Sequence, residues 1–317
     1  MYEEYYGFSE KPFSLTPDPK YLFKSASHAS AYELLQYAIR RREGFVVITG
    51  DIGTGKTTLC RALLEQIDRR TFTALVLNPF LAEEDLLRVV LQEFGVVSRE
   101  EIKRGRLARV SKAELVETLN EFLLSLRSIG AQALLILDEA QNLPMPVLEQ
   151  IRILSNLETD KEKLLQIILV GQSNLKDLLR RPELRQLDQR VAIRYDLKPL
   201  TAEETAAYVR HRLSVAGGGT AAAFTSTALA RVHRYTAGIP RLINLLCDRA
   251  LLTAYSAHAG RIVPAFVRSA AESLEIERPS RSLRGWVRER FAGFAAGVTL
   301  AAVLGAGAAA MWHYFRP

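Results

Sequence analysis

The segment from Gly50 to Thr57 constrains the fold of this chain more than any other feature. It reads Gly-Asp-Ile-Gly-Thr-Gly-Lys-Thr, a complete G-x-x-x-x-G-K-T phosphate-binding loop. An apolar run, Phe45–Ile48, precedes the loop, and a helical pattern from Leu59 to Ile67 follows it. In this context the backbone N–H groups of the loop and the helix N-terminus surround a polyphosphate. The sequence therefore predicts a nucleotide site at the end of a strand.

The loop also supplies side chains with chemical roles. Lys56 is expected to reach the terminal phosphates, and the Thr57 hydroxyl is expected to ligate Mg²⁺. ATP and Mg²⁺ are the cofactors that this motif predicts. The residues expected to bind the nucleotide here are Gly50, Gly53, Thr54, Gly55, Lys56, Thr57 and Thr58.

A second apolar run ends in two carboxylates. Leu134–Leu137 is followed directly by Asp138 and Glu139. Asp138 is expected to hold Mg²⁺, directly or through water, and Glu139 to polarise the attacking water as general base. The alternative interpretation is an ordinary strand that ends in a solvated acidic turn. A phosphate loop upstream in the same predicted sheet favours the catalytic interpretation.

Strand and helix patterns alternate from residue 44 to residue 200. This alternation predicts an α/β fold, a P-loop NTPase core with a parallel five-stranded sheet. The strand candidates are Phe45–Thr49, Ala74–Asn78, Leu134–Asp138, Ile167–Gly171 and Val191–Tyr195. The helical patterns between them cover 57–69, 83–94, 112–127 and 146–157, and the polar, basic segment 98–110 is interpreted as a surface excursion.

After residue 200 the strand patterns stop. Thr201 and Glu204 form a capping-box signature, and helical patterns follow at 202–216, 226–236, 240–257 and 264–275. The predicted organisation is an aromatic, proline-bearing lead-in (1–43), the nucleotide-binding core (44–200), a small all-helical lid (201–277), an arginine-rich linker (278–291), a transmembrane helix (292–311) and a short tail (312–317).

Three further polar positions follow predicted strands or begin a lid helix. Gln172 ends a strand and is expected to orient water or sense the γ-phosphate, although a simple strand-terminating turn is the alternative. Arg190, with Arg185 as second choice, is expected to reach a neighbouring subunit's nucleotide; the alternative is a solvated arginine. Arg241 follows Pro240 at a helix start, where a phosphate partner would offset the unfavourable dipole.

The C-terminal forty residues carry most of the excess positive charge. The chain's net charge is +7, and residues 278–317 contain six arginines and one glutamate, which leaves +2 for residues 1–277. The charge-free run Ala292–Met311 spans about 30 Å as a helix. We therefore expect a single-pass anchor in membrane lipid, with the preceding arginines keeping the body cytoplasmic. A buried hairpin helix is the alternative interpretation.

The two cysteines and the first residues of the chain indicate the cellular compartment of the protein body. Cys60 and Cys247 lie in apolar helical patterns and are interpreted as core residues rather than as a disulfide. The chain starts with an acidic and aromatic stretch, which does not have the pattern of a secretory signal peptide. Both features favour a reducing cytoplasm for the body.

Together these motifs resemble an AAA+ ATPase of the ExeA/GspA family, the general secretion pathway protein A group. The resemblance covers about residues 1–275 and rests on Tyr5-Tyr6-Gly7-Phe8, Lys11-Pro12-Phe13, Pro17-Asp18-Pro19, Gly44-Phe45, Asp138-Glu139-Ala140-Gln141-Asn142-Leu143, Gly171-Gln172, Gln189-Arg190 and Gly238-Ile239-Pro240-Arg241. Similar ATPases accompany pilus biogenesis and exopolysaccharide or exosortase loci.

The resemblance implies a homo-oligomeric ATP hydrolase at the bacterial inner membrane that works with envelope export-machine proteins. It implies sensor-1, arginine-finger and sensor-2 roles for Gln172, Arg190 and Arg241, and an aromatic lead-in close to the adenine. Secretion members of this family continue into a periplasmic peptidoglycan-binding domain, and because this sequence ends at Pro317 we do not carry their cell-wall role over as an expectation.

Two other functions share this core. A DNA-acting ATPase of the transposition or replication-initiation type would need a basic surface, and the charge of +2 on residues 1–277 counts against nucleic acid as a partner. A regulatory switch that binds ATP and scarcely hydrolyses it is the other alternative, and Glu139 argues against it.

Overall fold

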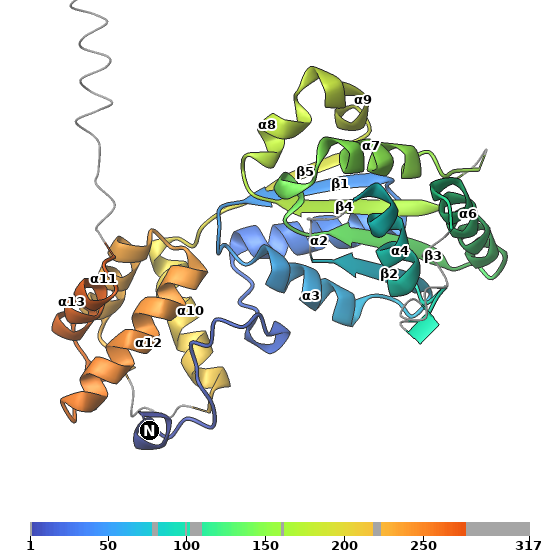
Figure 1. Ribbon diagram of the computed structural model, residues 1–317. Coiled ribbons are helices and arrows are strands. Elements are labelled where there is room, and N and C mark those ends of the chain that lie inside the picture. The colour runs from blue at the N-terminus through green and yellow to red at the C-terminus, as the bar shows by residue number, and fades with distance from the viewer. Residues whose placement is uncertain are drawn as a thin grey trace, which may run out of the picture. The chain divides into compact units, whose positions relative to one another are not determined.

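The computed structural model describes residues 2–77, 82–98, 100–101, 110–159, 162–217 and 223–276 (Figure 1). Within these residues one sheet of five parallel strands forms, as the sequence predicts, in the order β2-β3-β4-β1-β5. The strands are β1 (Phe45–Gly50), β2 (Thr71–Val76), β3 (Gln132–Leu137), β4 (Leu165–Gly171) and β5 (Ile193–Leu197).

The central strands are apolar on both faces, which is typical of a parallel sheet covered by helices on each side. Every residue of β1 and β4 is buried. β4 lies between β1 and β3, with Val47 paired to Leu169 and Leu135 paired to Ile167. Because all these strands run in one direction, their carboxyl ends share one edge of the sheet, where the loops that carry the polar motifs begin.

Alternate side chains of the strands form two separate clusters. Val46 and Ile48 pack with helices α2 (Ala26–Arg41) and α3 (Lys56–Gln66), whereas Val47 faces the opposite cluster. The opposite face is covered by α4 (Glu83–Glu93), α6 (Lys112–Ser128), α7 (Met145–Leu154), α8 (Leu175–Leu179) and α9 (Arg185–Asp188) (Figure 1). The short 3₁₀ turns of this part are η2 (Ala140–Asn142) and η3 (Pro182–Leu184).

The helices of the predicted lid follow the last strand. They are α10 (Ala202–Val215), α11 (Ser226–Thr236), α12 (Pro240–Ser256) and α13 (Pro264–Ser273). The predicted capping box at Thr201 and Glu204 is present. The expectation of an all-helical lid is wrong in one respect, because β6 (Ala223–Phe224) pairs in parallel with β7 (Arg261–Ile262). Two-residue strands carry no periodic pattern, so the sequence does not reveal them.

The N-terminal residues contribute to the core of the lid. Helix α1 (Tyr2–Tyr6) begins the described chain, and η1 (Pro19–Tyr21) follows later in the same segment. Tyr2, Tyr6, Phe8 and Phe13 are all buried in one cluster with α10–α13. The hydrophobic effect therefore holds the first residues of the chain against its last described helices.

The predicted strand bounds are least accurate at the sheet edges. β2 starts at Thr71 rather than Ala74, and β5 covers Ile193–Leu197 rather than Val191–Tyr195. Both are edge strands, and Phe72 and Arg194 are exposed. Because some side chains of an edge strand are exposed to solvent, its sequence lacks the continuous apolar run by which a buried strand is identified. The cysteines agree with prediction, because Cys60 and Cys247 are free and buried.

Two predictions concern residues outside the described ranges. Most of the segment 98–110 lies outside them, and so does the whole of the predicted span Ala292–Met311. Among the helices that the structure describes, none has both the length and the apolar character needed to cross a membrane.

Candidate nucleotide-binding site

Two glycines of the phosphate loop have backbone conformations that other residues rarely adopt. The φ angles of Gly53 and Gly55 are +79° and +100°. A Cβ at Gly53 would lie 2.6 Å from the Cβ of Arg241, and one at Gly55 would lie 3.1 Å from Nε2 of His28. The lid and helix α2 therefore pack against the loop so closely that only glycine fits without displacement.

Lys56, in the phosphate loop, is buried and is the first residue of α3. Its Nζ donates hydrogen bonds to the carbonyl oxygens of Gly50 and Asp51, each at 2.9 Å. Burial lowers the pKa of Lys56, and the nearby carboxylates of Glu139 and Asp138 oppose that shift. The ammonium group is thus held over the loop, in position to bind a phosphate that the loop amides surround.

Thr57 and Asp138 meet although the chain separates them widely. The Thr57 hydroxyl donates to Oδ2 of Asp138 at 2.5 Å, and Oδ1 of Asp138 accepts the backbone N–H of Glu139 at 2.8 Å. A hydroxyl and a carboxylate side by side are the oxygen ligands that Mg²⁺ prefers. The residues present therefore fit the metal that the motif predicts.

Glu139 lies next to this pair and lines the same cavity as Lys56 and Thr57. Its backbone is left-handed, with φ +52°. Oε2 of Glu139 accepts hydrogen bonds from Nε2 of Gln141 at 2.6 Å and from Nε2 of Gln172 at 3.4 Å. The structure thus brings the expected general base and the expected sensor, Gln172, to the ends of neighbouring strands.

Residues of the predicted lid and of the N-terminal segment also line the cavity. Arg241 lines it, and the backbone N–H of Arg241 donates to the carbonyl oxygen of Gly53 at 3.1 Å. Thr58 lines it as well, while Thr54 is buried and its hydroxyl donates to the carbonyl oxygen of Asp51 at 2.9 Å. Residues 14–18 of the N-terminal segment complete the wall.

Gln172 and Asp138 do not line the cavity themselves but hydrogen-bond to Glu139 and Thr57, which do, whereas Arg190 and Arg185 have no such bond to a lining residue among the described hydrogen bonds. Neither belongs to the described residues that line it. Arg185 is exposed on α9. Arg190 is half-buried and follows α9, and it adds to the effect of Lys163 in lowering the pKa of Glu158. Within one chain, therefore, neither guanidinium faces the site that holds Lys56.

His28 is a site residue that no sequence motif indicates. It is buried on α2, and its Nε2 lies 3.0 Å from the carbonyl oxygen of Thr54, so Nε2 carries the proton and donates. Nδ1 then accepts from the hydroxyl of Ser25 at 2.7 Å. Burial lowers the pKa of His28, against the opposing effects of the Thr54 bond and Glu204. The ring of His28 thus connects α2 to the backbone of the phosphate loop at Thr54.

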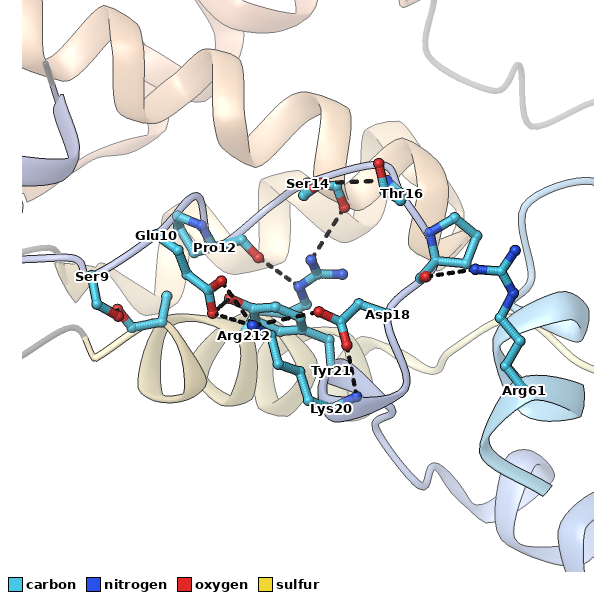
Figure 2. A network of polar contacts seen from close by, with 12 residues as sticks. Ser9, Glu10, Pro12, Ser14, Thr16, Asp18, Lys20, Tyr21, Arg61 and Arg212 are labelled. Atoms are coloured by element: carbon cyan, nitrogen blue, oxygen red, sulfur yellow. Dashed lines mark hydrogen bonds and ion pairs between the residues drawn. The ribbon is translucent and has the colours of Figure 1, made fainter. Parts of the chain in front are cut away.

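Arg212 is the second residue that sequence reasoning did not find. Figure 2 shows its guanidinium among the residues Ser9–Tyr21, which we call the N-terminal strap. The buried Arg212 donates to the carbonyl oxygens of Pro12 (2.6 Å) and Ser14 (3.2 Å), and it lies 4.1 Å from the ring centroid of Tyr21. This cation–π contact adds to the hydrogen bonds. Helix α10 of the lid therefore holds the strap.

The strap is also bound to the nucleotide-binding core. Nη1 of Arg61, on α3, donates to the carbonyl oxygen of Pro17 at 3.0 Å (Figure 2). Arg212 and Arg61 thus bind the strap backbone near the two ends of residues 14–18, the part that lines the cavity. The acceptors at Pro12, Ser14 and Pro17 are backbone carbonyl oxygens, which every residue has. The amino-acid sequence of the strap therefore gives no indication of these bonds.

Two comparisons relate the sequence of this chain to known proteins. A family model described as "AAA domain" matches residues 39–179. General secretion pathway protein A of Aeromonas hydrophila is 44% identical over 271 residues, which are 86% of this chain and 48% of that protein. The chain therefore spans about half the length of this curated relative.

Solved structures show the same fold at low sequence identity. Drosophila ORC bound to DNA has a TM-score of 0.63 and 17% identity over 85% of this chain and 65% of that chain. Cdc6p from Pyrobaculum aerophilum has a TM-score of 0.61 and 17% identity, and the match covers 86% of this chain and 70% of that chain. The Thermotoga maritima RuvB Holliday junction branch migration motor has a TM-score of 0.54 and 19% identity, and the match covers 80% of this chain and 70% of that chain. These likenesses concern the fold alone.

Proposed function

Because the chain is a homologue of General secretion pathway protein A that carries an AAA domain, we propose that it is an ATP hydrolase of an envelope secretion or export machine. In this proposal ATP hydrolysis assembles or drives that machine from the inner membrane. The observation that carries the proposal is the convergence of Lys56, the Thr57–Asp138 pair and Glu139 on one cavity.

Each side chain has one task in the proposed reaction. The loop amides and Lys56 bind the phosphates, and Thr57 with Asp138 holds Mg²⁺, which neutralises charge on the phosphates when bound. Glu139 takes the proton of the attacking water. Gln172, at the end of β4, senses the γ-phosphate, and Arg241 brings the lid to the nucleotide. Lys56, Thr57, Asp138, Glu139 and Gln172 follow strands at the same edge of the sheet, and Arg241 lines the cavity from α12, which supports this division.

Arg190 belongs to the neighbouring subunit's site in this proposal. An arginine stabilises negative charge as the γ-phosphate leaves, and it does so only close to the phosphate. In its own chain Arg190 lies away from the cavity. A homo-oligomer in which Arg190 faces the next subunit's nucleotide would supply the missing cation.

ATP hydrolysis by the full chain is the direct test of the proposed function. We expect turnover that requires Mg²⁺ and that is lost in Lys56→Ala, because that variant removes the cation of the phosphate loop. Lys24→Ala is a matched control, since Lys24 lies outside the cavity lining. Nucleotide binding by fluorescence titration should weaken in Lys56→Ala and remain unchanged in Lys24→Ala. Equal turnover in wild type and Lys56→Ala would refute the proposal.

The same assay separates the export function from a DNA-acting one. Turnover of the proposed export ATPase is independent of added double-stranded DNA. Stimulation by DNA that disappears at high salt would instead identify a nucleic-acid-dependent ATPase, because phosphate contacts weaken steeply with salt.

We also propose that Ala292–Met311 anchors the chain in the inner membrane with the ATPase on the cytoplasmic side. A charge-free run of about twenty residues matches the hydrocarbon thickness, and the arginines before it favour the cytoplasm. The full chain should stay in the membrane fraction after an alkaline wash, whereas a chain that ends at Glu277 should be released. A full chain recovered in the soluble fraction would contradict the anchor.

A further inference from the structure

Gln141 uses both ends of its side-chain amide within the site. Nε2 donates to Oε2 of Glu139 at 2.6 Å, and Oε1 accepts the backbone N–H of Gln172 at 2.9 Å. Gln141 lies in η2, directly after β3, whereas Gln172 follows β4. One side chain therefore connects the carboxylate that follows β3 to the backbone that follows the neighbouring strand.

Gly171 leaves the space that this connection needs. A Cβ built at Gly171 would lie 2.8 Å from Oε1 of Gln141 and 2.8 Å from Cδ2 of Leu175. Real Cβ atoms do not approach other heavy atoms so closely, so any larger residue at 171 would displace the amide or the leucine. The backbone of Gly171 has no unusual φ, so the close approach of Gln141 and Leu175 is what favours glycine there.

The backbone of Glu139 is strained, so contacts with other residues must hold its side chain in place. Its φ of +52° lies in the left-handed region, where a residue other than glycine is strained by about 1–3 kcal/mol. Its carboxylate is only half-buried. Two amide groups, from Gln141 and Gln172, donate to the same oxygen, Oε2. These bonds fix one carboxylate oxygen and leave Oε1 as the oxygen that receives a proton.

We propose that Gln141 is a positioning residue that holds Glu139 in place for proton abstraction and couples it to Gln172. This role rests on the proposed ATP hydrolysis with Glu139 as general base. No covalent step involves Gln141, because the amide donates to the carboxylate and accepts from the backbone without exchanging a proton. The side-chain hydrogen bonds described for Gln141 go to Glu139 and Gln172 rather than to the phosphate loop or the Thr57–Asp138 pair, so we expect nucleotide binding to be independent of this amide.

Two substitutions separate the donor from the acceptor function of Gln141. Gln141→Ala removes both hydrogen bonds. Gln141→Glu has nearly the same shape and still accepts the N–H of Gln172, but it has no donor for Glu139 and places a second negative charge beside it. Asn142→Ala is the matched control, since Asn142 is exposed in the same turn and is not part of the proposed machinery.

Steady-state ATP hydrolysis by the full chain tests the role. We expect kcat to fall about tenfold to a hundredfold in Gln141→Ala, because a displacement of about 1 Å costs that much. Gln141→Glu should be at least as slow, while KM for ATP and the affinity for nucleotide stay within about twofold in both variants. Asn142→Ala should behave as wild type. A kcat in Gln141→Glu within about twofold of wild type would overturn the proposal.

A double-mutant cycle with Gly171→Ala distinguishes the positioning role of Gln141 from a purely structural one. If the added methyl group acts by displacing Gln141, Gly171→Ala should lower kcat strongly in the wild type and little in Gln141→Ala. Additive losses, or loss of nucleotide binding together with turnover, would contradict the positioning role. Absence of hydrolysis in the wild type would instead refute the proposed function and this role with it.

Discussion

Glu139→Gln is expected to slow ATP turnover by about 10²-fold or more while ATP still binds, because the variant loses its general base. The glutamine side chain is nearly identical in shape to glutamate, and the Thr57–Asp138 pair and Lys56 remain in place. An amide cannot accept the proton of the attacking water. Single-turnover hydrolysis measures the chemical step, and nucleotide affinity is measured separately.

Glu203→Gln is the matched control for this experiment. Glu203 is exposed in the first turn of α10 and does not line the cavity, so the same chemical change there should leave turnover unaltered. If Glu139→Gln hydrolysed ATP at the wild-type rate, the assignment of Glu139 as general base would be wrong, and the chain would need another acceptor for the proton.

The same variant examines whether Arg190 acts on a neighbouring subunit. Neither Glu139→Gln nor Arg190→Ala alone should turn over ATP efficiently. Mixed together, they should recover part of the activity, because an intact Arg190 of one variant can then face an intact Glu139 of the other. Mass measurement of the mixture shows whether mixed oligomers form. Mixed oligomers without recovered activity would rule out action across subunits.

Gly238→Ala is expected to destabilise the fold by about 4 kcal/mol, a loss typical of a severe backbone clash. Gly238 has a φ of +78°, and a Cβ there would lie 1.9 Å from the carbonyl oxygen of Leu200. The backbone N–H of Leu200 also donates to the carbonyl oxygen of Gly238 at 2.9 Å. The chain enters the lid just after Leu200, so the methyl group would separate two backbone segments that the lid requires to be in contact.

Gly130→Ala separates the clash from backbone strain in this experiment. Gly130 has a similar φ of +69°, but a Cβ there would meet no heavy atom within 4 Å. That variant should lose only the cost of the left-handed conformation, about 1–3 kcal/mol. Urea denaturation of both variants gives the two free energies of unfolding. Equal losses would show that the contact between Gly238 and Leu200 does not limit stability.

The sequence by itself determined the parts of this protein that depend on local pattern. A glycine-rich loop after an apolar strand needs no distant residue to be identified, and the same is true of carboxylates that follow a strand. The parallel sheet follows from the alternation of strand and helix patterns, because parallel strands require crossovers. The contact between Thr57 and Asp138 was thereby foreseeable, since the carboxyl ends of parallel strands share one edge of the sheet.

Sequence patterns are less informative where an element is short or exposed on one side. The two-residue strands β6 and β7 have no period to detect, and the edge strands β2 and β5 were displaced by two or three residues. Gly171 and Gln141 both lie in segments that carry the family resemblance, yet neither segment indicates that a Cβ at one position would collide with the amide of the other.

Only the tertiary structure decided which distant groups meet at the cavity. His28 supports the loop from α2, and Arg212 and Arg61 hold the N-terminal strap through its backbone carbonyls. Any residue can present a carbonyl, and a buried histidine in a helix resembles any other core position, so these contacts carry no motif. They arise from burial of the strap, the core and the lid together, which no local pattern of residues encodes.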